Sequence, residues 1–438
     1  MKKMNEMLSR ITAVVLVAGV ALAGVAAAAD APSAKVERKG PLAGLPSEPG
    51  PHLEKIKALG DNQWLNLGSP EADPKWGKAC GRSWGAKMPY ASDLRGAFLT
   101  GEGPHGYIKP DGYLMDDLWF YDINSNRWIC VYPGMEIKTF VQRIKDKELK
   151  IDDNGLLVNK DGEPLPQHTM IHSYARVTYD PDMRRFAWGF GGSGGQYLNG
   201  TPKEGDDLLQ AQPGKWNDPS KSYSPWFYDT VAGRFNCYVL DEKGPGIRVD
   251  HGSTMIYVNS RKQYFLPLNA AYFDPASNKW VAAGAKGPMP TGMDHSSCYD
   301  PKRDRIYMGG GIYNGVTNAA DNFHMYDIKT ATWTKPNPTG KFPVQYTSNC
   351  AFFSYDAVND VVVLMQNFGK EIYVYNPETN AWSEPLITPK EVVLSSGFVN
   401  AFGNAFYDPE LNVFFCHFAS DGVPNGTMWA YRYKKAAK

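Results

Sequence analysis

Polar side chains that could bind a ligand recur at one place in a repeated pattern. That place is the start of the first strand expected in each repeat, and it is occupied by Arg82, His172, His251, His295, Asn349 and Asn404. Three more polar residues stand beside them: His168, Asp250 and Asp294. Imidazole, amide, carboxylate and guanidinium groups gathered at one opening suit hydrogen bonding to a polar ligand. We therefore expect a binding site where these residues meet.

The three histidines also allow a metal site. His172, His251 and His295 come from three successive repeats, and neutral imidazole binds zinc and copper. The alternative is that each ring serves nearby backbone groups, and that the repetition reflects repeat ancestry. The sequence therefore leaves two possibilities open, a bound copper or zinc ion and no cofactor at all.

A repeated pair of aromatic residues defines the elements that position these side chains. An aromatic residue followed by Asp or Asn stands seven positions before a second aromatic residue in five places: Tyr121 and Trp128, Tyr228 and Phe235, Phe273 and Trp280, Tyr326 and Trp333, and Tyr375 and Trp382. Turn-forming residues lie between the two, and alternating apolar residues lie on both sides. This pattern predicts a β-hairpin.

A second hairpin precedes the first in most repeats. Tyr299-Asp300-Pro301 leads through a turn into an apolar run from Arg305 to Met308, and Tyr407-Asp408-Pro409 leads into another. Each repeat therefore consists of four strands, a to d. Four-stranded sheets repeated around an axis form a β-propeller, which makes the chain all-β.

The two ends of the repeat region complete one another. Residues 428–433 have the pattern of a strand c with no strand d after it, and residues 61–67 have the pattern of a strand d with no strand c before it. Pairing them hydrogen-bonds two otherwise bare edges. We predict a six-bladed propeller whose ring is closed by an N-terminal strand that completes the last blade.

At this level of detail the chain resembles the Kelch-repeat family. The resemblance rests on the apolar strands that end in Gly191-Gly192 and Gly309-Gly310, followed by the Tyr-Asp and Trp pair, and it covers roughly residues 60–435. It implies a six-bladed galactose oxidase/Kelch-like propeller. The family includes copper-radical oxidases, sugar mutarotases and epimerases, and binding scaffolds, so the fold alone does not decide the function. The oxidases need a Tyr cross-linked to a Cys, which matches no particular pair here.

Loop lengths indicate where a site would lie. The long segments all connect strand b to c or strand d to the next a: residues 101–115, 134–167, 191–222, 284–294 and 310–322. These connections share one face of a propeller, and loops on a rigid scaffold commonly carry binding residues. Aromatic residues on or beside them could stack on a sugar: Tyr107, Tyr197, Trp216 and Tyr313. We expect a carbohydrate or a partner protein to bind at the channel mouth on this face, with a sugar-modifying enzyme as the alternative.

The N-terminus indicates export. Lys2, Lys3 and Arg10 precede an apolar run that ends in four alanines before Asp30. We expect residues 1–29 to be a signal peptide, 30–59 a flexible lead-in and 60–438 a single propeller, in a periplasmic or secreted protein without stable membrane insertion after cleavage. An uncleaved membrane anchor is the alternative.

Composition excludes one class of partner. The formal net charge is zero and no basic run is present, which argues against nucleic-acid binding. Six cysteines are scattered at about one per repeat without a Cys-x-x-Cys motif. Disulfide pairing and buried free thiols both remain open.

Overall fold

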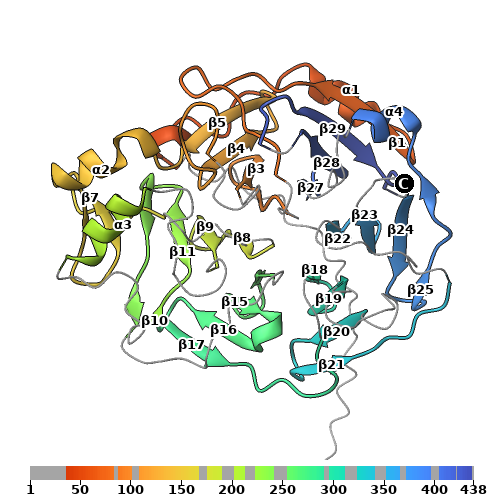
Figure 1. Ribbon diagram of the computed structural model, residues 1–438. Coiled ribbons are helices and arrows are strands. Elements are labelled where there is room, and N and C mark those ends of the chain that lie inside the picture. The colour runs from red at the N-terminus through yellow and green to blue at the C-terminus, as the bar shows by residue number, and fades with distance from the viewer. Residues whose placement is uncertain are drawn as a thin grey trace, which may run out of the picture. The chain divides into compact units, whose positions relative to one another are not determined.

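Strand pairing produces six antiparallel sheets of four strands each, which stand as blades around a common axis (Figure 1). The predicted six-bladed propeller is therefore confirmed. The computed structural model describes residues 36–82, 87–100, 108–166, 175–189, 202–212, 222–240, 254–290, 295–310, 323–340, 352–365, 371–395, 404–420 and 422–436. Its helices and strands belong to residues 37–438, which form one compact unit.

The first three blades follow one another along the chain, and their strands run from the axis outwards. Blade 1 contains β2 (Tyr90–Ala91), β3 (Gly96–Leu99), β4 (Leu118–Asp122) and β5 (Arg127–Tyr132). Blade 2 contains β8 (Val177–Asp180), β9 (Arg185–Trp188), β11 (Trp226–Asp229) and β12 (Arg234–Asn236). Blade 3 contains β14 (Ile256–Val258), β15 (Gln263–Leu266), β16 (Ala271–Asp274) and β17 (Lys279–Ala282).

The other three blades complete the ring. Blade 4 contains β18 (His295–Asp300), β19 (Arg305–Gly310), β20 (His324–Asp327) and β21 (Thr332–Thr334). Blade 5 contains β22 (Phe352–Asp356), β23 (Val361–Met365), β24 (Glu371–Asn376) and β25 (Ala381–Trp382), and β26 (Leu386–Ile387) also pairs with β24. Blade 6 contains β27 (Ala405–Asp408), β28 (Val413–Phe418), β29 (Thr427–Arg432) and β1 (Gln63–Gly68).

The remaining elements are short. They are η1 (Gly40–Leu42), α1 (His52–Ala58), α2 (Ile137–Lys145), β6 (Leu149–Ile151), β7 (Leu157–Asn159), α3 (Lys203–Gln210), β10 (Ser222–Tyr223), β13 (Val239–Leu240), η2 (Pro267–Asn269) and α4 (Lys390–Ser395). None of the helices in the described part of the chain has the length and apolar character that a membrane crossing requires.

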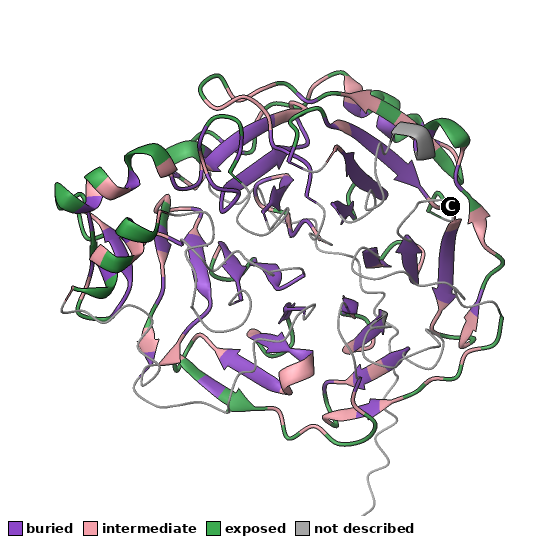
Figure 2. Cartoon of the chain, in the orientation of Figure 1, coloured by how far each residue is buried: buried purple, intermediate pink, exposed green. Residues whose placement is uncertain are grey.

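The two aromatic residues that stand seven positions apart lie opposite each other on neighbouring strands. Tyr121 lies opposite Trp128 across β4 and β5, and Tyr326 lies opposite Trp333 across β20 and β21. The second aromatic residue of each pair then packs into an apolar cluster shared with the preceding blade. Trp333, for example, is fully buried with residues of blades 3 and 4. These six clusters between blades form the core, as the buried strands in Figure 2 show.

The ring closes between the two ends of the propeller sequence. β1 pairs with β29, and Trp64 lies opposite Tyr431. Residues 37–59, within the expected lead-in, contain η1 and α1, whose Leu42, Leu53 and Ile56 are buried. This part of the chain therefore belongs to the packed unit.

Two insertions form a small cap with a core of its own. The cap consists of α2, β6 and β7 from the connection between blades 1 and 2, and α3 from the b–c connection of blade 2. Its apolar core includes Phe140, Ile144 and Leu209, and Lys145 forms an ion pair with Glu204 at 2.6 Å between α2 and α3. Both insertions arise from the face that carries the b–c and d–a connections, called the loop-rich face from here on.

Candidate functional site

Three of the nine predicted ligand-binding residues are described: Arg82, His295 and Asn404. The other six lie outside the described residues: His172, Trp216, His251, Asp294, Tyr313 and Asn349. The neighbouring His168 and Asp250 and the loop residues Tyr107 and Tyr197 also lie outside them. The proposed metal set His172, His251 and His295 therefore has one described member.

Arg82 and Asn404 lie together where blades 1 and 6 meet. The Asn404 side-chain amide donates a hydrogen bond to the Arg82 carbonyl oxygen at 3.1 Å. Both residues are buried, with 2% of Arg82 and 4% of Asn404 exposed. His295 is the first residue of β18, at the start of a strand a as predicted, and it is also buried.

A buried ionic network holds Arg82 in place. Asp117 accepts hydrogen bonds from the guanidinium of Arg82 at 2.6 Å, from the Lys109 ammonium at 3.1 Å and from the Trp119 indole at 2.8 Å. Burial alone would raise the pKa of Asp117, but the two cations hold it below its ordinary value. This network fixes the start of blade 1 beneath the loop-rich face.

Sequence reasoning missed a histidine beside this network. His417 is buried in β28, and its ring stands edge-on to Trp128 with 5.0 Å between the centroids. Burial, with a smaller contribution from Arg82, lowers the pKa of His417 to about 3. The ring therefore stays neutral at ordinary pH, and its place inside an apolar strand gave no signal in the sequence.

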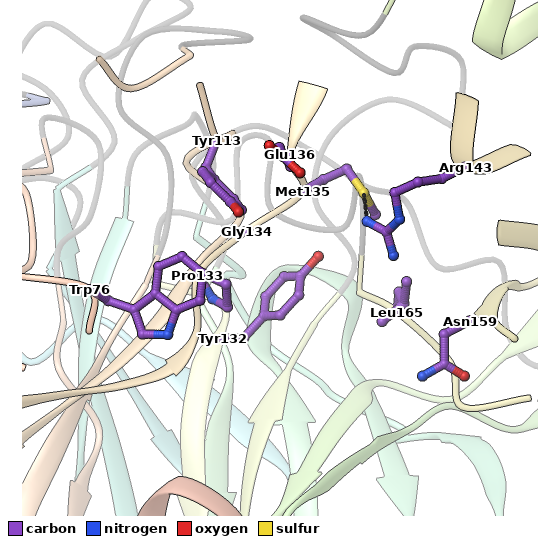
Figure 3. A pocket seen from close by; sticks show the side chains of 10 residues that line it. All are labelled: Trp76, Tyr113, Tyr132, Pro133, Gly134, Met135, Glu136, Arg143, Asn159 and Leu165. Carbon is purple, nitrogen blue, oxygen red and sulfur yellow. Dashed lines mark hydrogen bonds between the residues drawn. The ribbon is translucent and has the colours of Figure 1, made fainter. Parts of the chain in front are cut away.

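A pocket of about 260 Å³ opens at the outer side of blade 1 (Figure 3). Its lining consists of Trp76, Tyr113, Tyr132, Pro133, Gly134, Met135, Glu136, Arg143, Asn159 and Leu165. Tyr113 comes from a b–c connection, and Trp76 from the connection between β1 and β2. The other residues lie at the end of β5 or in the connection that builds the cap. The pocket therefore lies on the loop-rich face, between blade 1 and the cap.

Aromatic rings form one side of this pocket. Trp76 and Tyr113 stand edge to face, with 5.4 Å between their centroids. Tyr132 belongs to the same side, and Figure 3 shows its hydroxyl directed into the pocket. This hydroxyl is buried and has no hydrogen-bond partner among the described residues, and burial raises the pKa of Tyr132 well above its ordinary value. The phenol therefore remains a protonated donor.

Charged and amide groups form the opposite side. The Arg143 guanidinium lies 3.7 Å from the Met135 sulfur and 3.4 Å from a Glu148 carboxylate oxygen. The Glu136 carboxylate accepts a hydrogen bond from Thr139 at 2.7 Å and keeps its second oxygen for other partners. The pocket thus offers a guanidinium, a carboxylate and a phenol beside an aromatic wall.

Asp116 hydrogen-bonds to the backbone of the pocket lining. Its Oδ1 accepts a hydrogen bond from the Met135 backbone at 2.9 Å, and its Oδ2 is buried with no partner among the described residues. Burial raises the pKa of Asp116 to about 7, against the effect of the Met135 N–H. This carboxyl group therefore exchanges its proton close to neutral pH.

The sequence indicated the connections that form this pocket but not the pocket itself. Residues 101–115 and 134–167 were recognised as long insertions on the loop-rich face, whereas the expected site was the ring of strand starts. The aromatic residues Trp76, Tyr113 and Tyr132 were the available signal. They stand apart in sequence, and only the packing of the cap against blade 1 brings them together.

Metal ligation has no support in the described residues. Among them, no group of three or more His, Cys, Asp or Glu is arranged to hold an ion. Five cysteines, Cys80, Cys130, Cys237, Cys298 and Cys416, are described as buried free thiols, and Cys350 lies outside the described residues. No family model matches the chain, and no curated protein matches it.

Proposed function

We propose that the chain is an exported Kelch-like propeller that binds a carbohydrate in the pocket between blade 1 and the cap. The composition of that pocket carries the proposal. An aromatic wall of Trp76, Tyr113 and Tyr132 faces Glu136 and Arg143. Sugars present apolar C–H faces and hydroxyl edges, so a site for them combines aromatic rings with a few polar groups.

The size of the pocket limits the ligand. At about 260 Å³ it lies just below the roughly 300 Å³ at which small-molecule sites usually begin. A single sugar residue, for example the end of a chain, suits this volume better than an extended oligosaccharide. The phenol of Tyr132 and the guanidinium of Arg143 would donate to its hydroxyl oxygens, and Glu136 would accept from its hydroxyl groups.

A glycine at the end of a strand b supports the Kelch-like part of the proposal. A Cβ atom on Gly309 would lie 2.6 Å from the Phe353 ring of blade 5. The glycine therefore allows the next blade to pack closely, which is a physical reason for a Gly pair at this point of a repeat.

A glycan array followed by calorimetry tests the proposal. We expect the protein to retain a set of glycans that share a terminal residue, and we expect Trp76→Ala and Tyr113→Ala each to weaken binding about tenfold or more. Tyr238→Ala is the matched control, because Tyr238 is 43% exposed and does not line the pocket.

Two results would overturn this function. One is the absence of binding to any glycan by a folded protein. The other is binding that Trp76→Ala and Tyr113→Ala leave unchanged, which would place a carbohydrate elsewhere. A partner protein whose binding depends on Trp76 would keep the site but change the ligand class.

A further inference from the structure

A lysine reaches the axis of the ring from the innermost strand of blade 1. The innermost strands form a closed circle, since each of β2, β8, β14, β18, β22 and β27 contacts the next. Lys87 stands three residues before β2, at the end of that strand that faces the loop-rich side. Its ammonium donates to the Met255 carbonyl oxygen at 3.4 Å, and Met255 directly precedes β14 of blade 3. Blade 2 lies between blades 1 and 3, so this contact spans the axis region.

The ammonium has few partners for a group with three donors. Among the described residues, the Met255 carbonyl is its one hydrogen-bond acceptor, and no carboxylate forms an ion pair with it. The hydroxyl groups of Thr254, which precedes Met255 in the chain, and of Ser297 are neutral and hydrogen-bond each other at 2.7 Å. A cation that is largely removed from water without a counter-charge is unfavourable.

The carboxylates of the innermost strands do not serve Lys87. Four aspartates end innermost strands at the opposite face of the ring: Asp180 in β8, Asp300 in β18, Asp356 in β22 and Asp408 in β27. Each has a partner there. Asp180 pairs with Arg185 at 3.4 Å, Asp300 with Arg303 at 2.8 Å and Asp408 with Arg95 at 2.9 Å, and Asp356 accepts a hydrogen bond from the Tyr407 hydroxyl at 2.8 Å. The positive charge of Lys87 is therefore not compensated by them.

We propose that Lys87 is the cationic anchor of a second binding site, at the loop-rich end of the axis, for a ligand that carries an oxyanion such as a carboxylate. An ammonium ion is a compact point charge with rotatable donors and pairs readily with a carboxylate or phosphate group. This site is separate from the pocket between blade 1 and the cap, and it does not depend on the carbohydrate proposal.

The protonation of Lys87 gives this site a measurable signature. Burial lowers the pKa of Lys87 to about 8, although the residue as a whole is partly exposed. Among the described residues, the titratable group that acts on Lys87 is the Cys298 thiol, whose own pKa burial raises, so it stays neutral over this range. An oxyanion would raise the pKa of Lys87. Binding at pH 8 therefore takes up roughly half a proton, and affinity falls about tenfold per pH unit above pH 8.

Calorimetry at pH 8 in two buffers of different ionisation enthalpy measures this uptake. The ligands are glucuronate, glucose as its neutral counterpart, and inorganic phosphate. We expect glucuronate or phosphate, but not glucose, to bind with proton uptake, and the stronger of the two identifies the source of the oxyanion. Lys87→Met should remove the uptake and weaken binding at least about tenfold, whereas Lys55→Met, on the exposed side of α1, should not.

Competitive acylation of the unmodified protein provides a measurement that needs no variant. Mass spectrometry should show Lys87 reacting with an apparent pKa near 8, and the bound oxyanion should protect it. The proposal is overturned if neither anion protects Lys87, or if binding survives Lys87→Met unchanged. Loss of this binding in Lys87→Met but not in Trp76→Ala would separate the axis site from the pocket.

Discussion

Two neighbouring carboxyl groups in blade 1 have opposite pKa shifts because their surroundings differ. Asp117 faces Arg82 and Lys109, and its pKa is lowered. Asp116 accepts a hydrogen bond from the Met135 backbone instead, while its second oxygen is buried without a partner among the described residues. Its pKa is raised to about 7 because burial disfavours the charged form. Adjacent positions in the sequence thus give one permanent anion and one group that titrates near neutral pH.

Replacing Asp116 with asparagine should stabilise the protein in a pH-dependent way. The unfolded carboxyl has a pKa near 3.8 and the folded one near 7, so the native state binds the extra proton between these values. The contribution of Asp116 to stability is therefore present at low pH and lost as pH rises through this window, by at most about 4 kcal/mol. The amide of the substituted side chain would keep an acceptor for the Met135 N–H without a charge.

Denaturant unfolding at pH 5 and pH 8 measures this effect. The advantage of Asp116→Asn over the unmodified protein should be larger at pH 8 than at pH 5. Asp111→Asn serves as the control, because the Asp111 side chain is half exposed. An equal stability difference at both pH values would contradict the raised pKa of Asp116.

At the scale of the element, each c–d hairpin needs a left-handed residue at one position. The residue two places before the second aromatic has a positive φ in every blade: Asn62, Asn126, Gly233, Asn278, Ala331 and Asn380. In three blades the Asn side chain also accepts a hydrogen bond from the tyrosine of strand c, as Asn126 does from Tyr121 at 2.8 Å. Blade 4 has Ala331 instead, which neither favours this conformation nor accepts a bond from Tyr326.

Ala331→Asn should therefore stabilise blade 4 by about 1–2 kcal/mol. The substitution relieves the unfavourable φ of 52° and supplies an acceptor for the Tyr326 hydroxyl. Ala331→Gly separates the two effects, because it relieves the backbone alone and should give the smaller gain. Thermal unfolding of the three proteins measures the order. If asparagine proves no better than alanine, the comparison between blades fails.

The hairpins were predictable because their determinants are local. The spacing between Tyr121 and Trp128 sets a cross-strand pair, and Asn126, two places before the second aromatic residue, favours the turn, so both are visible within eight residues. The pocket was not predictable in the same way. Gly205 of α3 fits against Phe140 of α2 only because two insertions about sixty residues apart fold on one another. The predicted ring of histidines stays a prediction, since His172 and His251 lie outside the described residues.

At the scale of the whole molecule, the ring is held closed by its two ends. Besides the ladder between β1 and β29, the Tyr431 hydroxyl donates to Asn62 at 3.0 Å, and the Lys435 backbone donates to Asp61 at 2.8 Å. Arg432 donates to the Lys57 carbonyl of α1 at 3.0 Å. Trp64 packs on Tyr431 with 4.6 Å between the ring centroids. The same strand that completes blade 6 therefore carries the packing between blades 5 and 6.

Removing residues 61–67 should therefore destabilise the entire propeller rather than one blade. The deletion takes away a backbone ladder and the Trp64 packing, so we expect a loss of more than about 3 kcal/mol and a broadened unfolding transition. Deleting α3 of the cap, residues 203–210, is the control, because its buried Leu209 packs in the core of the cap and not in a cluster between blades. A synthetic peptide covering residues 60–69 should restore part of the lost melting temperature by pairing with β29. A deletion protein that melts like its parent would show that the ring holds together without its closing strand.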